Sequence, residues 1–192
     1  MLKYIRTIYI LKGSIIMELT KAIYERRSIR KYAPCVVKRE EIEELVAFAQ
    51  AAPSWKNSQT ARFYVALSDE ARASVRDGLA SFNRERTENV GAFIVTTLEH
   101  GVSGYMGDGS CTHLGNGFEC FDNGLAVQNM LLRAYEMGYG TLIMGLYKEN
   151  KLREILGIPE GENIVAVIAL GKADTDPEMP ERNEIEKVLK VF

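Results

Sequence analysis

Hydrophobic positions recur along this chain with two periods, one typical of helices and one typical of strands. The helical spacing of apolar residues predicts helices over residues 17–27, 40–52, 69–81, 119–137 and 148–156. Short runs rich in β-branched residues predict strands over residues 62–67, 92–98, 141–144 and 164–170. Because the two kinds of element are interleaved, the pattern favours one domain built around a single sheet.

The helix predicted over residues 119–137 is the longest element and is apolar over most of its circumference. Its apolar residues are Phe121, Leu125, Val127, Met130, Leu131, Leu132, Ala134 and Tyr135. A helix that is apolar on nearly all sides is enclosed by other elements, so we expect a central, nearly enclosed helix that ends at Gly138. Gln128 and Asn129 interrupt the apolar surface and are interpreted as amides satisfied within the core.

The charge balance and the cysteines exclude several classes of function. The chain carries 24 Lys and Arg against 26 Asp and Glu, so it lacks the overall positive field with which nucleic-acid binders neutralise phosphates. Three cysteines without a CxxC pair, Cys35, Cys111 and Cys120, argue against a disulfide framework and indicate a reducing cytoplasm. The spacing of Cys111, His113 and Cys120 matches no zinc pattern, and no metal site is expected.

The first sixteen residues are apolar but are interrupted by three cations. Such a segment is too short and too charged to span a bilayer, and no small-residue cleavage site follows it, so no membrane association is expected. Two interpretations stay open. Either translation starts naturally at Met17 and residues 1–16 are an upstream extension, or residues 4–11 add a strand or an arm.

A run of cations, RRSIRK, follows the first predicted helix at residues 26–31. If the chain is extended there, alternate side chains share one face, and Arg26, Ser28 and Arg30 point together. Two guanidinium groups and a hydroxyl form a donor set suited to a phosphate-bearing ligand. The alternative is a solvated basic turn without a ligand.

Four motifs follow one another along the chain. They are RRSIR at 26–30, APSWKNSQ at 52–59, GLAVQN at 124–129 and GYGT at 138–141. Together they resemble the nitroreductase family of FMN-dependent flavoproteins, over about residues 17–182. The resemblance implies an α+β fold with three α/β/α layers, in which helices flank a central mixed sheet of four to five strands and the long central helix is buried. It also implies an N-terminal extension at 1–16 and one FMN-binding domain at 17–192 with a C-terminal arm.

The resemblance implies roles for the basic motif. In this family the first Arg and the Ser of the motif hold the FMN phosphate, so Arg26 and Ser28 take that role, and Arg27 belongs to the same cofactor-binding set. Arg30 is implied to lie at the pyrimidine edge of the isoalloxazine. A fixed cation there would stabilise the negative charge that collects near N1 and O2 on reduction.

Further implied contacts come from the loop that follows the helix at 40–52. Pro53, Ser54, Asn57 and Gln59 correspond to the family's loop that reaches the flavin from the neighbouring subunit. Taken alone, these residues are also typical of a helix C-terminal turn with polar caps, and that alternative stays open.

Backbone and amide contacts to the flavin are implied elsewhere. Asn83 lies where many members place an Asn against the flavin pyrimidine ring, with an ordinary surface Asn as the alternative. Met144 and Gly145 fall where members aim backbone N–H groups at flavin N5, the atom that accepts and delivers hydride. Gly permits a close approach there. No side chain is therefore expected to act as a nucleophile or general base.

The C-terminal end departs from the family pattern. Many members carry a Lys-x-Arg pair that adds two cations to the phosphate, whereas the matching stretch here is Pro180-Glu181-Arg182. Arg182 then serves alone, or Lys172 substitutes for the missing Lys. Because family members commonly extend this end across a partner, we expect residues 184–192 to do so in a homodimer with FMN at the interface.

The implied activity is that of an FMN-dependent NAD(P)H oxidoreductase acting on nitroaromatics, quinones or related conjugated acceptors. No GxGxxG motif follows a strand, so NAD(P)H would dock over the flavin face later used by the acceptor, in a ping-pong mechanism with hydride transfer through N5. The alternatives are a flavin-binding sensor or carrier without turnover, and the family branches that dehalogenate substrates or fragment flavin.

The segment at residues 101–117 contains six glycines and little periodicity. Loops of this length in compact domains are usually functional or disordered, so we expect a long mobile loop. On the function implied above, it closes over the flavin, and Tyr105, Met106 and Leu114 cover the acceptor.

Overall fold

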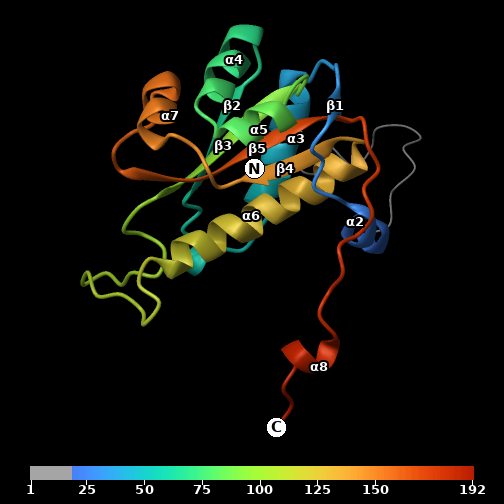
Figure 1. Cartoon of the computed structure of the whole chain (residues 1–192). Coiled ribbons are helices and arrows are strands. Elements are labelled where there is room, and N and C mark those ends of the chain that lie inside the picture. The colour runs from blue at the N-terminus through green and yellow to red at the C-terminus, as the bar shows by residue number, and fades with distance from the viewer. Residues whose placement is uncertain (1–18) are drawn as a thin grey trace.

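The computed structural model describes residues 19–192, and the predicted extension at 1–16 lies outside the described residues. The helices are α2 (Leu19–Glu25), α3 (Arg39–Gln50), α4 (Asp69–Asp77), α5 (Ser81–Arg86), α6 (Gly117–Glu136), α7 (Glu149–Leu156) and α8 (Ile185–Val188), with a 3-10 turn η1 (Trp55–Asn57). The strands are β1 (Tyr32–Ala33), β2 (Ala61–Ala66), β3 (Ala92–Glu99), β4 (Gly140–Met144) and β5 (Glu162–Ala173) (Figure 1).

One five-stranded sheet is built on β5, which pairs antiparallel with β3 and β1 and also with β4. Strand β2 extends the sheet beyond β3, again antiparallel. The pairings between the five strands are all antiparallel, so within residues 19–192 the one parallel contact of the expected mixed sheet is an isolated bridge between Ser28 and Thr141. This bridge attaches the basic segment to the edge of β4.

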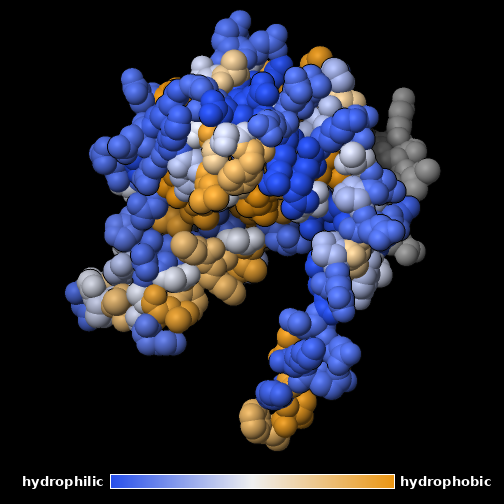
Figure 2. Space-filling model, in the orientation of Figure 1, coloured by the Kyte–Doolittle hydropathy of each residue, from blue (hydrophilic) through white to orange (hydrophobic). Residues whose placement is uncertain are grey.

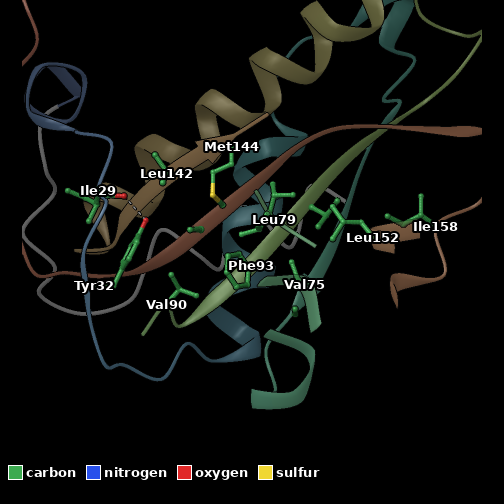
Figure 3. Close-up of a cluster of buried hydrophobic side chains, with 14 residues drawn as sticks. Ile29, Tyr32, Val75, Leu79, Val90, Phe93, Leu142, Met144, Leu152 and Ile158 are labelled. Atoms are coloured by element: carbon green, nitrogen blue, oxygen red, sulfur yellow. Dashed lines mark hydrogen bonds between the residues drawn. The ribbon is translucent and has the colours of Figure 1, made fainter. Parts of the chain in front are cut away.

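Alternation along the strands creates the two outer layers. Phe93 and Val95 of β3 belong to a buried cluster that includes side chains of α4 and α7 (Figure 3). Ala92 and Ile94 point the other way, into a second cluster with side chains of α3 and α6. Because successive strand residues face opposite sides, β3 and β5 contribute side chains to both buried clusters. The expected α+β fold, with helices on both faces of the sheet, is confirmed.

The helix predicted over 69–81 ends earlier, at Asp77, and the separate α5 was not predicted. Helix α4 begins after Ser68, which acts as its N-cap, because the Ser68 hydroxyl accepts from the Ala71 N–H at 3.2 Å. The end of α4 is determined by hydrogen bonds to a segment distant in the sequence. The Ala80 N–H donates to Leu146 O at 3.3 Å, and the Lys148 N–H donates to Gly78 O at 2.7 Å, so pairing with a distant segment draws the chain out of the helix.

Helix α6 is enclosed on one face only. Ala126, Met130 and Ala134 are buried as expected. Phe121 on the opposite face is 59% exposed, and Gln128 on that face is exposed rather than satisfied in the core. The expectation of a nearly enclosed helix is therefore wrong for the single chain. Figure 2 shows apolar side chains gathered on the face of the molecule where α6 and β4 lie.

The chain after β5 leaves the body as an extended tail that ends in α8 (Figure 1). Its last apolar side chains, Val188, Leu189, Val191 and Phe192, are exposed, and they form an apolar tip in Figure 2. None of the helices between residues 19 and 192 is long and apolar enough to cross a membrane.

Gly140→Ala tests the contact that seats the basic segment on β4. A Cβ at this position would lie 2.5 Å from Ile29 Cγ1, so we expect the free energy of unfolding to fall by about 1–3 kcal/mol. Gly161→Ala is the matched control, because nothing lies within 4 Å of its Cβ. Urea denaturation of both variants measures the difference, and equal losses would exclude the contact as the cause.

Candidate functional site

The basic segment is held in an extended conformation along β4. The Ile29 N–H donates to Thr141 O at 2.9 Å, and the Tyr32 hydroxyl donates to Ile29 O at 3.0 Å (Figure 3). Ile29 is buried, whereas Ser28 and Arg30 on either side of it are partly or fully exposed. The predicted extended segment is thus confirmed, and its alternate polar residues point away from the core.

Three guanidinium groups gather beside this segment. Burial lowers the pKa of Arg26 below its ordinary value, and the positive charges of Arg27 and Arg182 lower it further. Arg182 comes from the tail, far along the chain, and is close enough for its charge to act on Arg26 of the basic motif. Within residues 19–192 no carboxylate forms an ion pair with Arg26 or Arg182. A bound anion would relieve this repulsion.

Arg27 and Arg30 already use part of their donor capacity. Arg27 Nη1 donates to Tyr24 O at 2.6 Å and to Arg26 O at 3.0 Å, where it satisfies the C-terminal end of α2. Its Nε is buried and has no partner among the described residues. Arg30 Nη1 donates to Ser28 O at 3.1 Å. The Nε and Nη2 groups of Arg27 and most of the Arg30 guanidinium therefore have no partner among the described residues.

The turn after β4 lies next to the predicted Asn83. This Asn is 4% exposed, and its Nδ2 donates to Leu146 O at 3.5 Å. It is therefore a buried amide that holds the turn rather than a surface residue. Gly145 faces open space, because nothing lies within 4 Å of a Cβ built on it. The side chains of Ile143 and Leu146 are exposed and offer an apolar surface.

The loop from Pro53 to Gln59 lies at the opposite end of α6. The Trp55 N–H donates to Asp122 Oδ2 at 2.8 Å, close to the start of the helix. At the other end of the helix, the Tyr135 hydroxyl donates to Glu25 Oε2 of α2 at 2.9 Å. With a rise of about 1.5 Å per residue, these two points are about 20 Å apart along the helix axis. One chain therefore does not bring the two predicted parts of the site together.

This loop is conformationally strained. Lys56, Asn57 and Gln59 have φ angles of 46°, 56° and 50°, in the left-handed region. The Ser54 hydroxyl accepts from the Gln59 N–H at 3.0 Å and helps to hold this shape. Such residues persist only where the surroundings impose the conformation, and they concentrate at functional sites. The open alternative of an ordinary helix C-terminal turn does not explain three left-handed residues.

A cavity of about 330 Å³ lies beside this loop. It lies between α3, β2 and α6, and its polar lining includes Ser54, Gln59, Thr60 and Asp122. The Thr60 hydroxyl is buried and has no hydrogen-bond partner among residues 19–192. The cavity and its orphaned hydroxyl mark this end of α6 as a second region with unused polar groups.

The backbone of residues 101–117 is held by hydrogen bonds within the loop and to α6. Tyr105 and Cys111 form an antiparallel bridge, and the Thr112 N–H donates to Gly104 O at 2.9 Å. The Gly101 N–H donates to Glu119 Oε1 at 2.6 Å. The prediction of a long loop is confirmed, but the expected lack of internal order is wrong, because turns and a buried carboxylate fix the backbone.

Several anchoring residues were missed by the sequence reasoning. Asp122, Glu119 and Ser103 are all nearly fully buried, and Trp55 joins them through its backbone. Two carboxylates at the start of an otherwise apolar helix were the available signal, since buried charges require partners.

Other candidate residues have structural roles. The Lys172 ammonium donates to Gly138 O at 3.0 Å and lies 4.7 Å from the Tyr139 ring centroid, so it serves the C-terminal end of α6 rather than the cation cluster. Asn129 is a satisfied amide as predicted, with its Nδ2 donating to Phe48 O at 3.3 Å. Arg182 is the tail cation that the structure places near Arg26.

The three cysteines are free in the structure, with Cys35 half-buried and Cys111 and Cys120 exposed. Within residues 19–192 no group of three or more His, Cys, Asp or Glu side chains is arranged to hold a metal ion.

The sequence model of the nitroreductase family matches residues 23–96 and 114–172. This chain belongs to the nitroreductase family. An Archaeoglobus fulgidus protein named "Putative NADH dehydrogenase/NAD(P)H nitroreductase" is 30% identical to it over 171 residues, which cover 87% of this chain and 92% of that protein. The "NADPH-flavin oxidoreductase" of Vibrio harveyi is 27% identical over 169 residues, covering 84% of this chain and 68% of that protein.

Solved structures of other nitroreductase-family proteins share the fold. The family member from Clostridium novyi NT superposes with a TM-score of 0.71 at 27% identity, covering 85% of this chain and 89% of that one. An Exiguobacterium sibiricum protein crystallised in complex with FMN superposes with a TM-score of 0.81 at 22% identity, covering 92% and 98%. The layered architecture of this nitroreductase-family chain is therefore that of its solved relatives.

Arg182→Gln tests the clustering of like charges. Removing one cation relieves repulsion, so we expect the ligand-free variant to be as stable as the parent or slightly more stable. Millimolar inorganic phosphate should raise the Tm of the parent more than that of the variant. Lys187→Gln makes the same charge change on α8 and serves as control. Equal phosphate responses in all three proteins would remove Arg182 from the anion site.

Proposed function

We propose that this protein is an FMN-dependent NAD(P)H oxidoreductase that reduces nitroaromatics, quinones or related conjugated acceptors. The observation that carries the proposal is the cluster of Arg26, Arg27 and Arg182, which has no carboxylate partner within residues 19–192, next to the exposed apolar edge of β4. A ligand with a phosphate at one end and a flat conjugated ring at the other matches both features. The names of the relatives support flavin and NAD(P)H chemistry.

The residues around β4 fit FMN in a definite orientation. Arg26, Ser28 and Arg182 would hold the phosphate, and Arg30 would lie along the pyrimidine edge of the ring. The backbone N–H groups of the buried Met144 and the exposed Gly145 would face the ring. Bound FMN would accept hydride from NAD(P)H and pass it to the acceptor. Asn83 supports this arrangement by holding the turn after β4 in place.

The protein's contribution is placement and charge rather than acid–base chemistry. A fixed guanidinium at the pyrimidine edge stabilises negative charge that develops there on reduction. The exposed side chains of Ile143 and Leu146 exclude water from one side of the ring. Since no second nucleotide motif occurs, NAD(P)H and the acceptor would use the same open face in turn. Three free cysteines support a location in the reducing cytoplasm.

The active unit is proposed to be a homodimer with two FMN sites at its interface. The loop from Pro53 to Gln59 and the Arg26 cluster are separated by about 20 Å on one chain, so both can touch one flavin only if they come from different copies. The exposed face of α6 around Phe121 and the apolar tip of the tail provide surface for that contact. Large exposed apolar patches commonly mark interaction sites.

The phosphate assignment predicts a preference for FMN over riboflavin. Loss of the phosphate removes several charge-assisted hydrogen bonds, worth about 2–5 kcal/mol in binding free energy. Arg26→Ala with Ser28→Ala should abolish that preference and leave the fold intact. Fluorescence titration of both ligands measures it, and circular dichroism checks the fold. Equal affinity of the parent for the two flavins would contradict the assignment.

The same preparation tests turnover. FMN-loaded protein should be reduced by NADH or NADPH and reoxidised by nitrofurazone or menadione. Flavin that binds tightly but is neither reduced nor reoxidised in this way would favour the sensor or carrier. Release of halide from a halogenated aromatic, or loss of the flavin itself, would favour the specialised branches.

Phe121→Glu tests the dimer. A charge on the exposed face of α6 would be buried without a partner on association, so we expect a monomer that has lost most of its FMN affinity. Val36→Glu, in the loop between β1 and α3, is the control, because Val36 is also exposed. Analytical ultracentrifugation at micromolar concentration measures the mass. A parent protein that is monomeric with full FMN occupancy would refute the dimer.

A further inference from the structure

Trp55 lies where two loops of the chain meet. Its backbone N–H donates to Asp122 Oδ2 at 2.8 Å, and its indole Nε1–H donates to Tyr105 O at 3.3 Å. The indole ring packs at 4.8 Å between centroids on Phe118, which precedes the buried part of α6. The loop from Pro53 to Gln59 is therefore attached to the loop at 101–117 by both the backbone and the side chain of one residue.

Asp122 is the group that both loops require. Its side chain is buried, and its Oδ2 accepts from the Trp55 N–H and from the Ser103 hydroxyl, the latter at 2.5 Å. Ser103 is fully buried. Burying a carboxylate is costly unless its hydrogen bonds are made. Neither loop can move away without leaving this charge short of a donor.

A third contact connects the strained part of the first loop to the second. The left-handed Lys56 extends its ammonium to Met106 Sδ at 3.4 Å and over the Trp55 ring at 5.6 Å from the centroid. Strained residues of this kind persist only when neighbouring structure imposes them. The loop at 101–117 is the neighbour that supplies these contacts.

We propose that Asp122 is a positioning residue that joins the Pro53–Gln59 loop and the 101–117 loop into one wall, and that this wall serves the flavin held by the other copy of the chain. The proposal rests on the homodimeric flavoenzyme proposed above. The reason is geometric: the wall is anchored at the start of α6, about 20 Å from the same chain's phosphate-binding cations.

The composition of the wall indicates what it selects. Trp55 and Phe118 offer aromatic surface, and the exposed side chains of Met106 and Leu114 extend it along the second loop. Planar aromatic acceptors larger than a single ring would contact more of this wall than small ones. The 101–117 loop therefore selects acceptors by size, and Trp55 and Asp122 hold this loop in the position that selection requires.

The first test uses ligand-free protein, in which Trp55 is the only tryptophan. Asp122→Ala removes both hydrogen bonds, and we expect the acrylamide quenching of Trp55 fluorescence to increase about twofold or more. Asp122→Asn keeps an acceptor oxygen and should remain close to the parent. Asp77→Asn, an exposed carboxylate of α4, is the unrelated control. Quenching unchanged in Asp122→Ala would overturn the positioning role. Ser103→Ala provides the same test if Asp122→Ala does not fold.

The second test measures selectivity without NAD(P)H. FMN-loaded protein is photoreduced, and its reoxidation by p-benzoquinone and by menadione is timed. In Asp122→Ala we expect the ratio of the two rates to change about fivefold or more, with FMN affinity within about threefold of the parent. An unchanged ratio, or loss of FMN with the ratio intact, would overturn the proposal. A parent that NAD(P)H cannot reduce would count against the proposed function alone.

Mixed dimers decide which copy the wall serves. One dimer pairs a chain carrying Arg26→Ala and Ser28→Ala with a chain carrying Asp122→Ala. Its single flavin is held by the second chain and faces the intact wall of the first, so the parental rate ratio is expected. A second dimer places all three changes on one chain beside a parental partner, and the altered ratio is expected. The reverse pattern would show that each wall serves its own chain's flavin and would overturn the proposal.

Discussion

The pairing of β5 on both of its edges is the constraint on which the rest of this molecule depends. With β3 on one side and β4 on the other, β5 has no free edge over its central residues, and its alternate side chains must feed a core on each face. Helices α3 and α6 cover one face, while α4 and α7 cover the other. Strand β4 is left with an edge, and the basic segment from Arg26 to Arg30 occupies that edge through Ile29 and Thr141.

The site features lie where local rules of stability are broken. Arg26 stands among other cations without a carboxylate partner in residues 19–192, and Arg27 keeps a buried N–H without an acceptor there. At the far end of α6, three residues between Lys56 and Gln59 adopt left-handed angles. Folded chains tolerate such conflicts mainly at functional positions, where a ligand or partner resolves them. On the function proposed above, bound FMN and the second copy of the chain would supply the missing contacts in these two regions.

The length of α6 connects these two regions and keeps them apart. Its C-terminal end meets α2 through Tyr135 and Glu25, whereas its N-terminal end holds Asp122 beneath Trp55 and Ser103. A rigid helix of this length fixes the separation at about 20 Å. The same helix thus has the cation cluster near its C-terminal end and the aromatic side chains of Trp55 and Phe118 near its N-terminal end, and it has an exposed face that includes Phe121.

The sequence by itself determined the element types, the extended basic segment and the order of motifs that assigns the family, because periodicity and motif spacing are local properties of the chain. It also brought Arg182 into the candidate site through its motif. Only the tertiary structure decided where α4 ends, which face of α6 stays open and that Lys172 serves a helix end. It alone joined Trp55, Ser103 and Asp122. These outcomes depend on hydrogen bonds and charge contacts between residues that are far apart in the sequence, and local sequence patterns do not specify such contacts.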